Sequence, residues 1–393
     1  MKAWAEARVP RCSGGVEGAE LAYGIAAQIE YHVTNNVSAG FAPRYTLNVV
    51  PDTAERAAAR YRSRMRAVAI VNGNARRVGG RLRKKLEKVL PGGVRFTRSL
   101  DEARVAIREV IDRGTDLIVL GGGDGTFVMG LTLIEEACRG MNRPEPAIGV
   151  LRLGSGNAIA DTVGASDDAP HDLDQLARGR GTWRKVQMLD VLGVRAPFVG
   201  MGVDAQLLED NEAIGRTIDR VPGARRFVGG TARYALSVAL RSVPRFAREA
   251  RPNAVVTNLG AAATEMKRGG ATGRKVEAGE VLWSGACTLV AGATIPFFGF
   301  GLKMFAFSDA QSGRFHLRCG DAGLFEILRN TSAAFRGDYF SDHVTDFLCD
   351  RVAIELDQDA AIEAGGELLG RRRKVELALA APVTLVSLAN NPL

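Results

Sequence analysis

Two glycine-rich segments contain the residues whose types and spacing could perform chemistry. The first, residues 120–126, reads LGGGDGT, and the second, residues 153–160, reads LGSGNAIA. Glycine has no Cβ, so the backbone N–H groups of such segments can approach phosphate oxygens closely. Asp124 in the first segment supplies a carboxylate that could hold Mg²⁺ or accept the proton of a hydroxyl. Together the segments indicate binding of a nucleotide and transfer of a phosphoryl group.

The first segment matches neither of the two common phosphate-binding patterns. Reading G-x-G-x-x-G from Gly121 places Thr126 at the third glycine, and reading it from Gly123 places Val128 there. The chain contains no G-x-x-x-x-G-K-[ST] sequence. A Rossmann dehydrogenase and a P-loop NTPase are therefore disfavoured. A simple strand-to-helix turn would explain two glycines, but not four glycines around an aspartate.

The elements around these segments are expected to form a parallel sheet, because short apolar runs alternate with amphipathic stretches. The expected strands are 67–71, 94–97, 116–120 and 147–151, and the expected helices are 78–90, 99–113 and 126–139. Such alternation implies right-handed crossovers, and ligands then bind beyond the carboxyl ends of the strands. Three loops, 72–74, 121–126 and 154–157, are therefore expected at one edge of the sheet.

After about residue 188 the sequence changes to short apolar or alternating runs with frequent glycine, which is typical of a β-rich domain. The expected strands are 191–194, 198–203, 254–258, 281–291, 314–318, 352–356, 375–379 and 383–388, with one helix over 225–243. We therefore expect an extension of unknown role over 1–62, an α/β domain over 63–188 and a β-rich domain over 189–393. A return of the last strand to the first domain stays open.

Composition and charge limit the class of protein. The formal net charge of +8 over 393 residues indicates an anionic partner. Five scattered cysteines and four histidines show no ligand spacing, so no zinc site or disulfide framework is expected. The N-terminal residues lack the apolar region of a secretory signal. Glycines and Pro296 divide the apolar stretch 283–307 into pieces of strand length, so we expect a cytoplasmic protein without a membrane-spanning helix.

The two glycine segments together resemble the diacylglycerol kinase catalytic family of lipid kinases, which includes bacterial soluble lipid kinases, sphingosine kinases and ceramide kinases. The sequence GMGVDA at 200–205 is similar to the G-x-G-x-D-A strand of that family. NAD kinases and phosphofructokinases share the G-G-D-G loop, but NAD kinases carry an asparagine-acid pair where this chain has 154–160. The resemblance covers roughly residues 66–388. It implies an α/β domain of the NAD kinase or diacylglycerol kinase type that holds ATP, and a C-terminal β-sandwich that holds lipid.

The resemblance also implies roles for residues at matched positions. The implied nucleotide-binding residues are Asn72, Gly73, Thr97, Gly122, Gly123, Asp124, Gly125, Thr126, Phe127, Val128, Gly154, Ser155, Gly156 and Asn157. Asp124 and Glu367 are the expected catalytic residues, and Asp124 and Asp309 are the expected ligands of Mg²⁺. Asn157, at the start of a helix, is either a nucleotide contact or an N-cap.

Two departures from the family pattern concern acidic residues. The second-domain hairpin of the family usually ends in Asp-Gly-Glu, whose aspartate is the proposed general base, whereas this chain has Gly365, Gly366 and Glu367. The Asp-Gly pair that the family uses for a structural Mg²⁺ site is matched by Ser312 and Gly313. Two interpretations stay open: Asp124 serves as the base, or the protein binds nucleotide or lipid without turnover.

The expected function is an ATP- and Mg²⁺-dependent lipid kinase that transfers the γ-phosphoryl group to a hydroxyl of a diacylglycerol- or sphingoid-type lipid. The alternatives are a regulatory relative that binds lipid or nucleotide with weak or no catalysis, and an NAD kinase-like enzyme. A membrane is expected to present the lipid, with peripheral contact at its inner face. Nucleic acid is not an expected partner, and a homodimer stays open.

Two basic clusters could rest on anionic head groups, namely the run 371–374 and a helix face. That face consists of Arg81, Arg83, Lys84, Lys85 and Lys88. The phenylalanine-rich stretch 294–307 is expected in the core of the second domain rather than along an acyl-chain cleft.

Overall fold

The computed structural model describes most of the chain beyond its first 64 residues. The described residues are 65–219, 251–299, 301–323, 326 and 329–389. They belong to one compact unit, Met65–Leu393. The expected N-terminal extension and the helix expected over 225–243 lie outside the described residues.

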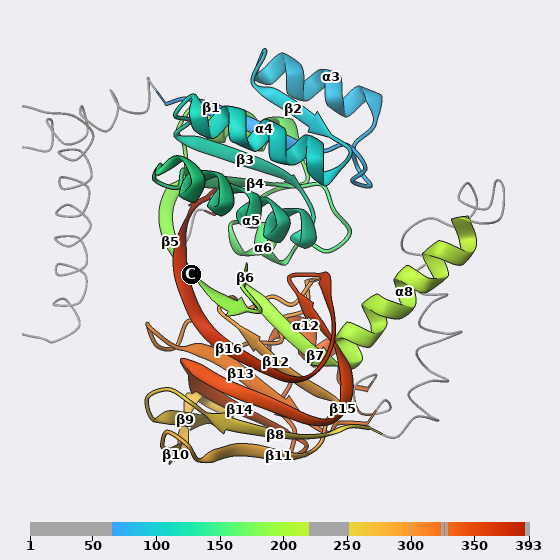
Figure 1. Cartoon of the computed structure of the whole chain (residues 1–393), viewed down its shortest axis with the longest axis vertical. Coiled ribbons are helices and arrows are strands. Elements are labelled where there is room, and N and C mark those ends of the chain that lie inside the picture. The colour runs from blue at the N-terminus through green and yellow to red at the C-terminus, as the bar shows by residue number, and fades with distance from the viewer. Residues whose placement is uncertain (1–64, 220–250, 300, 324–325, 327–328, 390–393) are drawn as a thin grey trace, which may run out of the picture. The chain divides into compact units, whose positions relative to one another are not determined.

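Four parallel strands form the first part of the fold (Figure 1). They are β1 (Ala67–Asn72), β2 (Val94–Thr97), β3 (Leu117–Gly122) and β4 (Ala147–Arg152), in the order β4-β3-β1-β2. The helices of this part are α3 (Gly80–Val89), α4 (Leu100–Asp112), α5 (Asp124–Met141), α6 (Ala158–Thr162) and α7 (Ala169–Ala177). Every residue of β3 is buried, which explains its continuous apolar run. The expected parallel α/β arrangement is confirmed.

Local signals set the ends of two helices. The Ser99 hydroxyl caps α4 by accepting a hydrogen bond from Glu102 N at 3.1 Å, as its position before an acidic first turn predicts. The helix α5 begins at Asp124, two residues before the expected start at Thr126, because the extended Gly123 is its N-cap. Asn142 ends α5 in the left-handed conformation, with φ 50°. The earlier start places Asp124 inside the first turn of α5.

Antiparallel strands dominate the second part. The elements are β5 (Thr182–Val191), β6 (Val194–Ala196), β7 (Phe198–Gly202), α8 (Val203–Asp219), β8 (Asn253–Asn258), β9 (Ala263–Met266), a 3₁₀ turn (Arg268–Gly270), β10 (Thr272–Val276), β11 (Val281–Ala286), β12 (Leu289–Ala293), β13 (Phe315–Gly320), α12 (Thr331–Arg336), β14 (Val344–Cys349), β15 (Arg351–Ala364) and β16 (Glu367–Ser387). The strands run β10-β9-β14-β13-β12-β7-β15 in one row, and β15 also pairs with β8, which pairs with β11. One strand shared between two rows is how a sandwich forms its corner. The expected β-sandwich is confirmed.

The last strand, β16, continues from the antiparallel part into the parallel sheet, as the long red ribbon in Figure 1 shows. It pairs antiparallel with β15 and β5, and Leu385 pairs with Ile148 of the parallel strand β4. Two separate strands, 375–379 and 383–388, were expected here. They are one strand with an irregular register between Ala380 and Val383, where Pro382 lacks a backbone N–H. The division of the chain at residue 188 stays a prediction, since β5 runs across that position.

Two other expected strands were wrong in their bounds. Residues 191–194 are the turn between β5 and β6, with Leu192 and Gly193 at φ 53° and 78°. The stretch 281–291 is two strands, β11 and β12, that pair with different partners. The expected core position of the phenylalanine-rich stretch is confirmed at Phe305, which is fully buried. Phe300 lies outside the described residues. Among the helices that the structure describes, none has the length and apolar character needed to cross a membrane.

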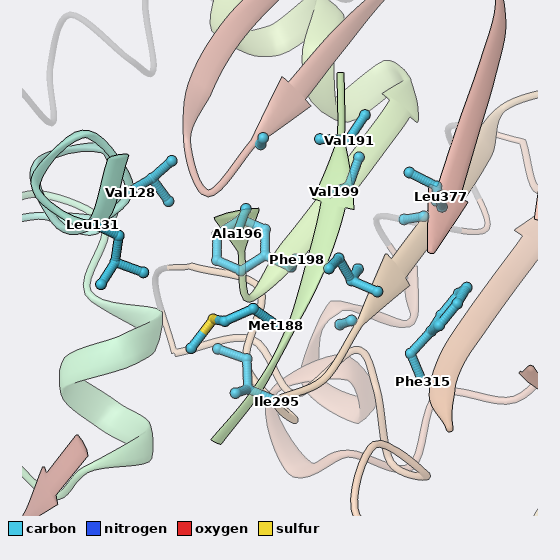
Figure 2. Packing of buried hydrophobic residues seen from close by; sticks show 14 of the residues in the cluster. Val128, Leu131, Met188, Val191, Ala196, Phe198, Val199, Ile295, Phe315 and Leu377 are labelled. Carbon is cyan, nitrogen blue, oxygen red and sulfur yellow. The ribbon is translucent and has the colours of Figure 1, made fainter. Parts of the chain in front are cut away.

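One buried cluster joins α5 to the antiparallel strands. In Figure 2, Val128 and Leu131 on α5 face the region of Ala196, Phe198 and Met188. An ionic contact supports the same junction: the Arg195 guanidinium is buried and lies 2.7 Å from Glu135 and 2.6 Å from Glu145. The helix α5 therefore packs against the second part of the fold along its buried face.

A second buried polar group lies within the sandwich. The Asp346 carboxylate accepts hydrogen bonds from Arg318 Nε at 2.7 Å and Nη2 at 3.0 Å, and lies 2.9 Å from His316 Nε2. Phe307 N donates to His316 Nδ1, so the Nε2 atom carries the proton that Asp346 accepts. Burial would raise the pKa of Asp346, but Arg318 and His316 outweigh it and hold the pKa at about 2.

Candidate active site

Three loops at the carboxyl ends of the parallel strands meet at one place. Asn72 Nδ2, at the end of β1, donates to Thr126 Oγ1 in the first turn of α5 at 3.1 Å. Leu153 N, after β4, donates to Gly122 O at the end of β3 at 3.0 Å. The loop after β1 also joins β2, because Gly73 N donates to a carbonyl of β2 at 2.7 Å. The structure thus brings the three expected loops to one edge of the sheet.

Close backbone contacts account for the glycines of these loops. A Cβ at Gly154 would overlap the backbone of Gly123, and a Cβ at Gly123 would lie 2.9 Å from Gly156 O. A Cβ at Gly122 would overlap the Thr126 side chain. The glycines are therefore required for contact between the loops themselves, a reason that the sequence alone did not reveal.

The first turn of α5 presents backbone donors at this meeting point. The first hydrogen bond within α5 runs from Phe127 N to Gly123 O at 3.1 Å, so the N–H groups of residues 124–126 precede it. These groups lie at the positive end of an 18-residue helix, where anions bind favourably. Phe127 and Val128 follow, and both side chains are buried in the core. The helix turns both side chains inward, and the expected role of Phe127 and Val128 in binding a nucleotide stays a prediction.

Asp124 is a buried carboxylate that links two helices. Its side chain is only 6% exposed, and its Oδ1 atom accepts a hydrogen bond from Ile159 N, in the first turn of α6, at 3.1 Å. Burial raises the pKa of Asp124 to about 6, against the lowering effect of the backbone hydrogen bonds from Ala158 and Ile159. Its Oδ2 atom lies beside Gly156, whose Cβ, if present, would be 2.9 Å away. The carboxylate is thus protonated in part of the molecules near pH 6.

Sequence reasoning missed the charged residues that act on Asp124. Asp161 in α6 raises the pKa of Asp124, and Arg152 at the end of β4 lowers it. Arg152 and Asp161 themselves form an ion pair. No motif marks either residue, because their effect depends on the folding of α6 back toward β4.

Asn157 and Ser155 shape or border the loop after β4. Asn157 occupies the N-cap position of α6, but its side chain makes no capping hydrogen bond. Instead its Oδ1 accepts from Gly154 N at 3.2 Å and its Nδ2 donates to Gly154 O at 3.1 Å. Ser155 is exposed at the tip of this turn. The side chain of Asn157 therefore closes the loop. The N-cap alternative is right in position but lacks the capping hydrogen bond, and the nucleotide contact stays a prediction.

The β15–β16 hairpin brings a second carboxylate to the site. Ala364 pairs with Glu367, so Gly365 and Gly366 form a two-residue turn with φ values of 56° and 84°. Both values are positive, as a type I′ hairpin turn requires. A Cβ at Gly125 would overlap the Glu367 carboxylate. Burial raises the pKa of Glu367, and Glu212 of α8 adds to this effect.

Val128 explains why no acidic side chain is present at position 365. A left-handed turn residue could be aspartate as well as glycine. A Cβ at Gly365, however, would overlap Cγ2 of Val128, whose side chain is fully buried. The position where the family usually has its proposed general base is therefore packed by an apolar side chain.

The two expected ligands of Mg²⁺ occupy different environments. Asp124 is buried, whereas Asp309 is exposed in the loop between β12 and β13. Across the residues that the structure describes, no three His, Cys, Asp or Glu side chains are grouped to hold a metal ion. The roles expected for Asp124 and Asp309 as ligands of Mg²⁺ stay predictions.

The geometry of the site is typical of phosphate-binding α/β proteins, in which glycine loops and a helix N-terminus meet at the carboxyl ends of parallel strands. Residues 66–191 match the family model of the diacylglycerol kinase catalytic domain. The predicted resemblance to this family is therefore confirmed over this part of the chain.

Solved structures show the same fold. One is a diacylglycerol kinase from Bacillus anthracis str. Sterne, with a TM-score of 0.54 and 14% sequence identity. A second, from the same organism and described provisionally as a diacylglycerol kinase, has a TM-score of 0.55 and 14% identity. Each match covers 83% of this chain and 97% of the solved chain. No curated protein matches the sequence.

Proposed function

We propose that the protein is an ATP-dependent lipid kinase, which transfers the γ-phosphoryl group of ATP to a hydroxyl of a diacylglycerol- or sphingoid-type lipid. The observation that carries this proposal is the buried Asp124 carboxylate beside the first turn of α5, where the three loops and the hairpin tip meet. The match of residues 66–191 to a lipid kinase catalytic family supports the same reaction class.

In this proposal the backbone donors of α5 bind the phosphates of ATP. The N–H groups of residues 124–126 and the helix dipole favour negative charge there, without side-chain rearrangement. Asn72, Gly73, Thr97 and the 154–157 loop hold the surrounding backbone in place through the contacts described above. Mg²⁺ would arrive with ATP and neutralise part of its charge.

Asp124 is the proposed proton acceptor. The lipid hydroxyl oxygen forms a bond to the γ-phosphorus, the bond to the leaving ADP oxygen breaks, and the hydroxyl proton passes to Oδ2 of Asp124. The raised pKa of Asp124, about 6, suits this role because a base is most effective when its pKa lies near the working pH. Glu367 lies beside Gly125 in the first turn of α5. There it would orient that turn and shield the acceptor hydroxyl and the phosphate from solvent.

One observation favours a second candidate, a protein that binds nucleotide or lipid without turnover. Val128 fills the space beside Gly365, and the Asp124 carboxylate is engaged by the backbone of α6. A chain of this kind would keep the phosphate-binding turn and lack an accessible base.

The test is a transfer assay with the full chain, labelled ATP and Mg²⁺, against mixed micelles of diacylglycerol, sphingosine or ceramide, and against NAD. Label in a lipid that is lost in Asp124→Asn supports the proposal. Gly140→Ala is the matched control, because Gly140 lies in α5 with open space around it. Binding of ATP without transfer would favour the second candidate, and label in NAD would indicate an NAD kinase-like enzyme. A chain that binds neither ATP nor lipid would refute both proposals.

A further inference from the structure

An exposed aromatic side chain on α12 stands out on the second part of the fold. Six large apolar side chains of the described residues are strongly exposed: Leu100, Val105, Leu192, Val255, Val281 and Phe335. Phe335, 48% exposed, is the aromatic member of this set. Burying the exposed part of this ring against a partner would gain hydrophobic free energy. The residues around it indicate what kind of partner could cover it.

Two exposed arginines lie near Phe335 in the sequence, on and just before α12. Hydrogen bonds from Asn330 N to Glu326 O and from Ala334 N to Asn330 O, both 3.0 Å, show that the helical turns begin before α12. Residues spaced three or four apart share one face of a helix. The exposed residues Arg329, Ser332, Phe335 and Arg336 have this spacing. Arg329, Ser332 and Arg336 therefore share one exposed face, and Phe335, next to Arg336 in the sequence, lies about 100° from it around the helix.

Residues 297–299 and 301–303 lie next to α12. Lys303 N donates to Ala334 O at 2.9 Å, and a Cβ at Gly301 would lie 3.9 Å from the Phe335 ring. The Lys303 ammonium lies 5.5 Å from the ring centroid of the half-buried Phe297. We call Phe297, Leu302, Lys303, Arg329, Phe335 and Arg336 the α12 surface.

Aromatic contacts fix the segment around Phe298 to the core of the sandwich. The Phe298 ring packs edge-on against Phe198 at 5.1 Å and against Phe305 at 5.4 Å, between ring centroids. Phe198 and Phe305 belong to the buried core. The α12 surface is therefore fixed to the sandwich, so covering it does not require this segment to reorganise.

The charges of the α12 surface are largely available to an anionic partner. Arg336 lies 3.5 Å from Asp338, but both side chains are more than 60% exposed, and such pairs contribute little. Within the described part of the chain, Lys303 and Arg329 have no carboxylate within ion-pair distance. The α12 surface thus carries three cations together with Phe335, and one of these cations pairs with an exposed carboxylate.

The two basic clusters expected from the sequence lack this combination. In the run 371–374, Arg371 pairs with Glu209 at 3.0 Å, Arg373 with Asp359 at 3.2 Å, and Lys374 with Glu355. On α3, Arg83 donates a hydrogen bond to Gly73 O, and its guanidinium lies over the ring of Phe96. The other members of the α3 face are exposed cations without an exposed aromatic residue on that helix. Of these three clusters of described residues, the α12 surface is the one that combines cations with an exposed aromatic ring.

We propose that the α12 surface binds the anionic surface of a lipid bilayer, with Phe335 inserted among the head groups and Lys303, Arg329 and Arg336 at lipid phosphates. An exposed aromatic ring with cations on the same surface fits a bilayer interface, where apolar and anionic groups lie within one side-chain length. The choice of a bilayer as partner rests on the proposed lipid kinase function, whereas the surface itself rests on the contacts above.

The test measures sedimentation of the full chain with phosphatidylcholine vesicles, with and without phosphatidylglycerol. We expect binding only to the anionic vesicles, reduced about 5-fold for each of Arg329→Gln and Arg336→Gln, since each charge near such a surface contributes about 1 kcal/mol. Phe335→Ser should reduce binding about 5- to 10-fold, because about half of the ring is available for burial. Leu192→Ser, also at a 48% exposed residue, is the matched control and should bind like the wild type.

Three results would overturn the proposal: binding that does not depend on phosphatidylglycerol, no binding to either vesicle, or Phe335→Ser binding like the wild type. A change of oligomeric state in Phe335→Ser with vesicle binding unchanged would assign the surface to contact between copies of the chain. Turnover of a short-chain acceptor dispersed without vesicles separates this proposal from the catalytic one. Phe335→Ser should keep that turnover, whereas a wild-type chain without turnover would refute the kinase function and leave the vesicle result standing.

Discussion

Replacing Asp124 by asparagine tests how the fold tolerates its buried carboxylate. Burial raises the pKa of this side chain from 3.8 to about 6. The folded protein then holds a proton that the unfolded chain has released, so stability falls as the pH rises from about 4 to about 6. At 1.36 kcal/mol per pKa unit, the charged carboxylate costs the folded state about 3 kcal/mol at pH 7. Asparagine keeps the acceptor for Ile159 N and carries no charge.

Asp124→Asn is therefore expected to be more stable than the wild type by up to about 3 kcal/mol at pH 7, with almost no difference near pH 4. Urea unfolding between pH 4 and pH 8, followed by circular dichroism and tryptophan fluorescence, measures this difference where the two signals coincide. The control is Asp167→Asn, because hydrogen bonding to Arg77 lowers the pKa of the exposed Asp167, so any pH effect should have the opposite sign. A destabilised Asp124→Asn variant whose deficit does not change with pH would refute this reasoning.

Four further results are expected. If Asp124 is the base, kcat/KM should rise with pH through about 6 and then level off, as a pH-rate profile would show. Gly365→Asp should lower stability by about 1–3 kcal/mol through overlap with Val128, and adding Val128→Ala should relieve part of that loss in a double-mutant cycle of urea unfolding. Gly154→Ala should lower the free energy of unfolding by a similar amount, seen as a lower thermal midpoint, because its Cβ would overlap Gly123. Gly140→Ala, at a position of α5 with open space around it, should raise the free energy of unfolding by about 0.5–1 kcal/mol. Asp346→Ala should cost about 3–5 kcal/mol in urea unfolding, because it leaves a buried guanidinium without its carboxylate.

The parallel part of the fold could be predicted because its signals are local. The strand β2 lies at the expected residues, and β1, β3 and β4 differ from expectation by one or two residues. Each is a short apolar run followed by an amphipathic helix, and the cap at Ser99 lies within three residues of its partner. No distant contact is needed to recognise such elements.

The antiparallel part was less predictable because its strands depend on distant partners. Strand β10 is mostly polar with one buried position, and β9 is only four residues long with two buried positions, so their sequences resemble loops. Strand β14 contains Asp346, which is buried only because Arg318 and His316 of the neighbouring strand surround it. A carboxylate within an apolar run argues against a strand until those partners are known.

The candidate site was found from its glycines, but its internal contacts were not. Gly123 and Gly154 are separated by the whole of α5 and strand β4, yet their backbones touch. The overlap of position 365 with Val128 joins segments still farther apart. The spacing of four residues between Asp124 and Val128 could have placed Val128 on the buried face of α5. The family motif instead grouped Val128 with the residues of the phosphate loop.

The same contacts bear on whether the site is catalytic. Loops that touch through Gly123 and Gly154 already hold the N–H groups of α5 in place, so a phosphate would bind without reorganising them. Linking α5 to α6 requires only a hydrogen-bond acceptor, which an uncharged asparagine at position 124 would supply at lower cost. A carboxylate that lowers stability at neutral pH is the kind of group that function retains. A gain of stability together with a loss of phosphoryl transfer in Asp124→Asn would therefore separate a catalytic carboxylate from a structural one.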